Sequence, residues 1–121
     1  MTRGYPKVTI ITVNFNGKKY LKKLFDSIFC LNYPKDKLEI FLVDNVSTDN
    51  SIEFVKKNYR KIKIIKNDVN NYCKALNLGI ERAGAEYVAL INNDLRLDKN
   101  WLIELTKVIT KDEKIGCVGT K

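Results

Sequence analysis

The feature that most limits the fold of this chain is a regular alternation of short apolar runs with amphipathic helical patterns. Four runs rich in β-branched and aromatic residues, each bounded by polar turn residues, are typical of buried strands and lie at residues 8–13, 39–43, 62–65 and 87–91. Apolar residues at helical spacing follow each run, at residues 21–29, 52–59, 72–83 and 101–109. A fifth short strand is expected at residues 115–118.

This alternation predicts right-handed βαβ units. We therefore expect an α/β fold, a Rossmann-like and mainly parallel sheet with helices on both faces. The 121 residues, 45% of them hydrophobic and 30% charged, suit one globular domain at 1–121. No apolar run reaches the roughly 20 residues of a membrane span, and the N-terminus lacks the apolar stretch of a signal peptide. A cytoplasmic location is expected, with peripheral attachment at the inner face of the membrane left open.

The chain has no histidine, which excludes His-activated nucleophiles, His-ligated metals and a histidine general base. Its three cysteines, Cys30, Cys73 and Cys117, are widely spaced and form no CxxC pair. We expect buried free thiols rather than a disulfide or a zinc site. The net charge of +8 fits a lysine-rich solvated surface, and also nucleic acid, an anionic membrane or a phosphorylated small molecule as partner.

Every predicted strand ends in polar residues. The strands run into residues 14–17 (NFNG), 44–49 (DNVSTD), 67–68 (ND) and 92–94 (NND). Because open parallel sheets bind ligands beyond the carboxyl ends of their strands, we expect Asp44 and Asp94 to leave neighbouring strands on a common side and to face one cleft. Each cluster alone has an ordinary explanation in turns and caps, and Asp49 and Asp98 are expected to cap the second and fourth helices.

A carboxylate that follows a buried strand can accept hydrogen bonds from a nucleobase or ribose, or bind a divalent cation that screens a diphosphate. The usual phosphate cradles, GxGxxG after the first strand and GxxxxGK[ST], do not occur. Dinucleotide oxidoreductases and P-loop enzymes are therefore disfavoured. In a nucleotide site of this kind, phosphates would have to be held through a metal.

Four segments carry a family resemblance: VTIITVNFNG, LVDNVSTDNS, NDVNNYCKALNLGI and EYVALINNDLRLDKNWL. In this order they resemble the donor-binding half of the family 2 glycosyltransferases, which have the GT-A fold, and in particular its rhamnosyltransferase-like branch. The resemblance implies transfer of a sugar, with inversion at the anomeric carbon, from a nucleotide diphosphate sugar donor to a saccharide or lipid-linked acceptor. It also implies Mg²⁺ or Mn²⁺ bound at a DxD-type motif.

For the nucleoside, the resemblance indicates the end of the first strand, at Val13, Asn14 and Phe15. Asp44 matches the aspartate that hydrogen-bonds the base. Asn45 stands where a second acidic residue is common.

For the rest of the donor, the resemblance indicates Asn77 and Gly79 on the helix that lines the site. Residues 92–94 fall at the DxD position, where Asp94 matches the metal-binding carboxylate and Asn92 and Asn93 lie in the donor site. Asn92 is neutral where many relatives carry an aspartate, so we expect weaker metal binding.

The family's acceptor-side region, with its acidic general base, is expected beyond Lys121. The chain is therefore expected to bind a donor and to transfer sugar poorly by itself. The alternative is a non-catalytic nucleotide-binding or interaction subunit that pairs with another chain, for example as a homo-oligomer, or with the membrane surface. Nucleic acid is not expected as a partner, because the sequence has neither an RNP-type aromatic pattern nor a recognition helix.

Overall fold

The centre of the protein is a four-stranded, fully parallel sheet in the order β3-β2-β1-β4. The structure is a computed structural model, and it describes residues 5–119. The strands are β1 (Val8–Asn14), β2 (Leu38–Asp44), β3 (Lys63–Lys66) and β4 (Tyr87–Ile91). This arrangement confirms the predicted α/β class with a mainly parallel sheet.

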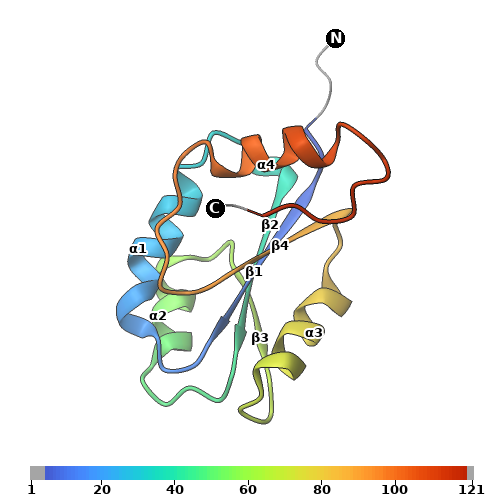
Figure 1. Cartoon of the computed structure of the whole chain (residues 1–121). Coiled ribbons are helices and arrows are strands. Elements are labelled where there is room, and N and C mark those ends of the chain that lie inside the picture. The colour runs from blue at the N-terminus through green and yellow to red at the C-terminus, as the bar shows by residue number, and fades with distance from the viewer. Residues whose placement is uncertain (1–4, 120–121) are drawn as a thin grey trace.

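Helices cover both faces of this sheet (Figure 1). One face carries α1 (Lys18–Phe29) and α2 (Ser51–Asn58), and the other carries α3 (Tyr72–Arg82). A short 3₁₀ turn, η1 (Lys35–Lys37), leads into β2, and α4 (Trp101–Ile109) follows β4. All four predicted helices are therefore confirmed, with bounds that differ by a few residues.

Two hydrophobic clusters hold the layers together, one on each face of the sheet. Alternate residues of β1 point to opposite faces, so that Ile10 belongs to the cluster with α1 whereas Ile11 belongs to the cluster with α3. The predicted apolar stripe of α1 is fully buried in the first cluster, through Leu21, Leu24, Phe25 and Ile28. A parallel sheet buried on both faces needs such near-continuous apolar strands, which explains why the strand runs stand out in the sequence.

Two expectations are wrong. Residues 115–118 form no strand, so β4, which pairs only with β1, stays an edge of the sheet. The three cysteines are free, as expected, but all are exposed rather than buried. Cys30, for example, is the residue that ends α1, so it lies beyond the apolar stripe that packs against the sheet.

Within the described residues, no helix is both long and apolar enough to cross a membrane.

Candidate functional site

The carboxyl ends of three strands are joined by one amide side chain, that of Asn14. Its Nδ2 atom donates a hydrogen bond to Asp44 Oδ1 at 3.0 Å. Its Oδ1 atom accepts one from Asn93 Nδ2 at 2.9 Å. Asn14 ends β1, Asp44 ends β2, and Asn93 lies two residues beyond β4. The predicted gathering of strand-end polar residues at one edge is thus present, and we call it the rim.

The rim also corrects one expectation. Asp44 and Asp94 follow strands that are not neighbours, because β1 lies between β2 and β4 in the sheet. The two residues still belong to the same edge, since all four strands run in the same direction. Asn14 ends the intervening strand β1 and is bonded to Asp44 on one side and to Asn93, the neighbour of Asp94, on the other.

Asp44 lies beneath the surface of the rim. It is 2% exposed, and besides the bond from Asn14 its Oδ2 atom accepts a hydrogen bond from the backbone N–H of Ser47 at 2.9 Å. Both carboxylate oxygens are therefore already used within the protein. Within the protein, Asp44 fixes the loop after β2.

Hydrogen bonds tie the loop after β2 to the loop after β1. Ser47 Oγ accepts from the backbone N–H of Asn16 at 2.8 Å, and Asn16 Oδ1 accepts in turn from the N–H of Thr48 at 2.7 Å. Both loops thus depend on each other for their shape.

Asp49 joins the N-terminal ends of two helices. One carboxylate oxygen accepts from the backbone N–H of Lys18 at 3.0 Å, and the other from the N–H of Ser51, also at 3.0 Å. Partial burial raises the pKa of Asp49, but the hydrogen bonds from Ser51 and Lys18 outweigh it and leave the pKa below its ordinary value. The expected cap is wrong in position, because Asn50 is the N-cap residue of α2 and its side chain forms no capping hydrogen bond. Asp49 lies one residue earlier and binds the N–H of the first residue of both helices.

Three non-glycine residues of these loops have a left-handed backbone: Asn16 (φ 50°), Val46 (φ 62°) and Asn50 (φ 66°). Asparagine tolerates this conformation, whereas a β-branched residue is strained in it. Val46 is also 45% exposed, so burial of its side chain does little to offset the strain. Backbone strain of this kind is concentrated at functional sites.

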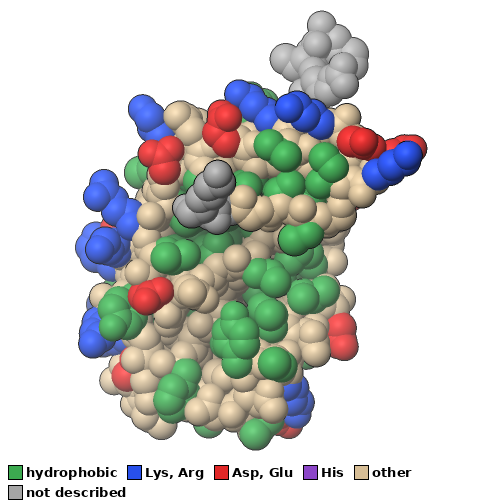
Figure 2. Space-filling view, in the orientation of Figure 1, with side chains coloured by type: hydrophobic (Ala, Val, Ile, Leu, Met, Phe, Trp, Pro, Cys, Tyr) green, Lys and Arg blue, Asp and Glu red, His purple; other side chains and the backbone are tan. Residues whose placement is uncertain are grey.

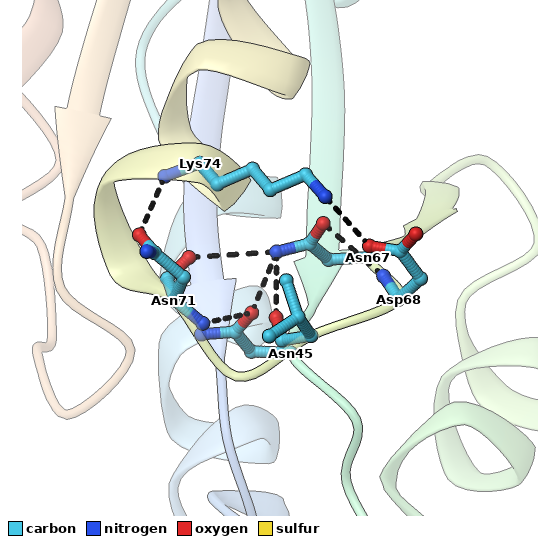
Figure 3. Close-up of polar contacts among 6 residues, drawn as sticks. Asn45, Asn67, Asp68, Asn71 and Lys74 are labelled. Carbon is cyan, nitrogen blue, oxygen red and sulfur yellow. Dashed lines mark hydrogen bonds and ion pairs between the residues drawn. The ribbon is translucent and has the colours of Figure 1, made fainter.

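Buried amides link the end of β2 to the loop after β3 (Figure 3). Asn45 Oδ1 accepts from Asn67 Nδ2 at 2.9 Å and from the backbone N–H of Asn71 at 3.3 Å, and Asn45 Nδ2 donates to Asn70 Oδ1 at 3.0 Å. Asn71 also caps α3 by accepting from the N–H of Lys74 at 2.9 Å. In the sequence, Asn45 is notable only because it replaces an acidic residue that is common at this position. No sequence pattern predicts its hydrogen bonds with residues of the loop after β3.

The open side of the rim carries different groups. Asp94 and Asn92 are exposed, and among the described residues neither side chain forms a hydrogen bond or ion pair. Phe15, directly after Asn14, is 50% exposed. No three acidic or thiol side chains of residues 5–119 lie close enough together to hold a metal by themselves. A cation at Asp94 would therefore need further ligands from other groups, such as amide oxygens, water or a bound phosphate.

Gly17 is the point of closest packing at the rim. A Cβ atom at this position would lie 2.2 Å from Asn93 Nδ2 and 2.6 Å from Asn14 Oδ1. The backbone φ of Gly17 is −106°, which any residue can adopt, so space alone explains the glycine. The missing side chain leaves room for the hydrogen bond between Asn14 and Asn93.

The remaining predicted residues lie away from the open side of the rim, on β1, on α3 and before α4. Gly79 is buried, and a Cβ atom there would lie 2.9 Å from Ile11 Cγ2, so close packing of α3 on the sheet accounts for it. Val13 packs in the same cluster, and Asn77 is exposed on α3. Asp98 accepts from the N–H of Asn100 at 2.9 Å just before α4. Asn100 itself is the N-cap residue of α4, so the expected cap by Asp98 is wrong.

This parallel α/β domain carries a rim of asparagine and aspartate side chains at the carboxyl ends of its strands. Comparison with known proteins assigns such a domain to a family. The model of glycosyl transferase family 2 matches residues 9–121. The chain belongs to this family. The match is to the family as a whole and does not identify the rhamnosyltransferase-like branch.

Relatives by sequence include a dolichyl N-acetyl-alpha-D-glucosaminyl phosphate 3-beta-D-2,3-diacetamido-2,3-dideoxy-beta-D-glucuronosyltransferase of Methanococcus voltae. It is 31% identical over 121 residues, which cover 93% of this chain and 38% of the relative. The poly(ribitol-phosphate) beta-N-acetylglucosaminyltransferase TarS of Staphylococcus aureus is 26% identical over 100 residues, or 79% of this chain and 18% of TarS. The chain thus spans less than two fifths of the length of either relative.

Solved structures agree with the fold. TarS 1–349 in complex with UDP-GlcNAc superposes with a TM-score of 0.79 at 27% identity, over 87% of this chain and 31% of that one. The mannosyltransferase PcManGT from Pyrobaculum calidifontis, solved with GDP-Man and Mn²⁺, gives a TM-score of 0.85 at 24% identity, over 98% of this chain and 37% of that one. The four-stranded domain is therefore a GT-A-type α/β fold.

Proposed function

We propose that this chain is the donor-binding part of a glycosyltransferase that moves a sugar, with inversion, from a nucleotide diphosphate sugar to a saccharide or lipid-linked acceptor. The observation that carries the proposal is the rim, where Asn14 fixes the strand-end loops around Asp44 and Asn93 while the adjacent Asp94 stays open. Family membership and the likeness to TarS, whose structure contains UDP-GlcNAc, support it.

The open groups of the rim suit a divalent cation that is shared with a diphosphate. Mg²⁺ prefers oxygen ligands and is commonly held by one or two carboxylates together with substrate phosphates and water. Asp94 supplies one carboxylate and Asn92 an amide oxygen, and neither side chain is bound elsewhere among the described residues. Mg²⁺ or Mn²⁺ at this position would neutralise charge on the departing nucleoside diphosphate.

The other rim residues act by position. Asn14 and Asp44 hold the loops after β1 and β2 in place, and the buried amides around Asn45 extend this support to the loop after β3. Phe15 keeps half of its ring exposed beside them, where the flat face of a nucleobase can stack on it. We propose that Phe15 stacks on the base, beside Asp44, which the resemblance assigns to hydrogen bonding with the base.

Sugar transfer also needs a base for the acceptor hydroxyl. Besides Asp94, the carboxylates that follow the strand ends are Asp44, Asp49 and Asp68, and each is already bound to a partner: Ser47 and Asn14, Ser51 and Lys18, and Lys74. We therefore expect these 121 residues to bind a donor nucleotide and to transfer sugar slowly or not at all.

Titration calorimetry with UDP, GDP and dTDP, each with and without Mn²⁺, tests the proposal. We expect one of the three to bind, with an affinity that rises when Mn²⁺ is present. If none binds under either condition, the chain is not a donor-binding domain.

Two variants test the role of Asp94. Asp94→Asn removes the one open carboxylate at the rim, and we expect it to abolish the gain in affinity from Mn²⁺. Asp98→Asn is the matched control, because Asp98 lies four residues later and already accepts from Asn100. If the Mn²⁺ effect survives in Asp94→Asn, or disappears equally in Asp98→Asn, the assignment of Asp94 is wrong.

A further inference from the structure

The positive charge of the protein is concentrated in one part of the chain. Residues 7–66 contain thirteen basic and six acidic side chains, whereas residues 67–119 contain seven basic and eight acidic ones. The net charge of +8 therefore comes almost entirely from the first of these segments. A solvated surface with evenly spread lysines would not show this division.

The fold places much of this charge on one side of the molecule. Helices α1 and α2, with residues 59–61 after α2, contain eight basic and only two acidic side chains. The basic ones are Lys18, Lys19, Lys22, Lys23, Lys56, Lys57, Arg60 and Lys61, and the acidic ones are Asp26 and Glu53. All eight basic residues are exposed. Both helices cover the same face of the sheet, and basic side chains line the edge of the molecule along α1 (Figures 1 and 2). We call this side the basic face.

The other helices lack this excess. In α3, Lys74 and Arg82 accompany Glu81, and in α4 a single lysine pairs with Glu104. On the basic face, by contrast, only Lys22 forms an ion pair among the described residues, with Asp26 at 2.7 Å. The other seven cations of the basic face thus remain available to an anionic partner.

The aromatic residues of the basic face favour an anionic membrane surface over a nucleic acid as its partner. Proteins that bind single strands stack successive bases on aromatic side chains, but Phe29 and Phe54 are engaged with Tyr59 in packing between α1 and α2. Tyr20 alone is well exposed among the aromatic residues of these helices, at 39%, with Lys19 Nζ 5.0 Å from its ring centre. Tyrosine is enriched at membrane–water interfaces, where its amphipathic ring lies at the level of the lipid headgroups.

The basic face also contains an open hollow of about 550 Å³, lined by Lys18, Lys19 and Lys22 together with Asn16, Asp49 and Phe54. Lys22 is paired with Asp26, whereas the ammonium groups of Lys18 and Lys19 form no ion pair among the described residues and suit the phosphate of a lipid headgroup. The N-terminal end of α1 does not compete for that anion, because Asp49 already accepts from the N–H of Lys18.

We propose that the basic face attaches the protein to a bilayer that contains anionic lipids. Each lysine near such a surface contributes about 1 kcal/mol, so several together give stable attachment. Because the rim lies at the N-terminal ends of α1 and α2 rather than on their outer sides, attachment through these sides leaves the rim open. A nucleotide from the water and an acceptor at the membrane surface could then reach the same edge of the sheet.

Vesicle sedimentation of the full chain tests this proposal. We expect binding to vesicles of phosphatidylcholine with phosphatidylglycerol, no binding to phosphatidylcholine alone, and release when the salt is raised from about 0.05 M to about 0.5 M, because salt screens exposed charges. Equal binding to both kinds of vesicle, or no binding to either, would overturn the proposal. So would tighter binding to single-stranded polynucleotide than to the anionic vesicles.

A matched pair of triple variants tests which surface is used. Lys19→Gln, Lys23→Gln and Lys57→Gln together remove three charges from the basic face, and we expect the partition onto anionic vesicles to fall about a hundredfold. Arg82→Gln, Lys111→Gln and Lys114→Gln remove the same charge elsewhere and should lower it only slightly. An equal loss in both variants would show that net charge alone matters and would refute the surface assignment.

Two further measurements keep this test separate from the donor proposal. Circular dichroism should show unchanged folding, because all six substituted residues are exposed. Nucleotide affinity should be the same in both triple variants, so that a failure of membrane binding leaves the rim untested and a failure of nucleotide binding leaves the basic face untested.

Discussion

Asn14 and Asp44 are partners in the register of β1 and β2, and the amide of one donates to the carboxylate of the other at 3.0 Å. The bond lies at the last residue of each strand, where the sheet gives way to loops. Asn14 is fully buried and Asp44 nearly so, so water cannot take the place of either partner. The geometry of the rim depends on this pair.

Replacement of Asn14 by alanine should therefore be costly. Asp44 Oδ1 and Asn93 Nδ2 would each lose a partner, and of the two only Asp44 is buried. An unsatisfied buried polar group costs about 1–3 kcal/mol, so we expect the free energy of unfolding, measured in urea, to fall by about that amount. Nucleotide binding should weaken as well, because the loops after β2 and β4 lose their common support.

Asn92→Ala is the control for this variant, since Asn92 is exposed and next to Asn93. Its effect on stability should stay within about 0.5 kcal/mol. A similar small effect for Asn14→Ala would show that the rim does not depend on the bridging amide.

Gly17→Ala should disturb the same bridge by crowding. The new methyl group would overlap Asn93 Nδ2 and Asn14 Oδ1, and overpacking of this kind costs about 1–3 kcal/mol. Gly116→Ala is the matched control, because a Cβ atom there meets nothing within 4 Å. We expect a lower melting temperature and weaker nucleotide binding only for Gly17→Ala. If the melting temperature of Gly17→Ala equals that of Gly116→Ala, the side chains of Asn14 and Asn93 can shift to accommodate the methyl group, and the prediction is wrong.

Val46→Asn should stabilise the protein. Asparagine accepts the left-handed backbone at φ 62° with less strain than valine, so a gain of about 1 kcal/mol is expected. Val69, which is 46% exposed and has no positive φ, provides the control. Val69→Asn should show no such gain. Thermal unfolding of both variants decides the matter, and a destabilised Val46→Asn would argue against relief of strain.

Asp49 should make stability depend on pH. Its pKa in the folded protein lies below the ordinary value of 3.8, so its hydrogen bonds contribute fully above that value and are lost as the pH falls through the lower, folded pKa. Asp49→Asn should therefore flatten the loss of stability between about pH 5 and about pH 2. Asp36→Asn, at an exposed carboxylate of η1, should leave the curve nearly unchanged. An unaltered acid limb in Asp49→Asn would refute the role of this residue.

Most of the fold could be predicted from the sequence because its signals are local. Backbone periodicity explains two of these features directly. Residues 10 and 11 of a strand point to opposite faces, and so to the two hydrophobic clusters, and the apolar residues from Leu21 to Ile28 share one side of a helix. Residues 115–118 show the limit of that reasoning. Their composition suits a strand, and residues 116–118 line a hollow together with residues 87–90 of β4, but the segment does not pair with that strand.

The site was predictable in position but not in detail. Parallel strands bring residues 14, 44 and 93 to one edge of the sheet whatever the order of the strands, so this gathering can be predicted from the sequence. The order β3-β2-β1-β4, and hence the place of Asn14 between Asp44 and Asn93, depends on how the chain crosses over. The burial of Asp44 depends on the turn at Ser47, whose N–H it binds. The partners of Asn45 come from loops with no regular pattern.

The central position of β1 has a consequence for engineering the donor preference. One amide, that of Asn14, is bonded to residues of both flanking connections, so neither connection can be redesigned in isolation. In the proposed donor site, a graft at one connection that is intended to change the accepted nucleobase would also shift the residues of the other connection, which we propose to lie beside the phosphates. Exchange of specificity between relatives should therefore succeed when position 14 and both connections are transplanted as one cassette.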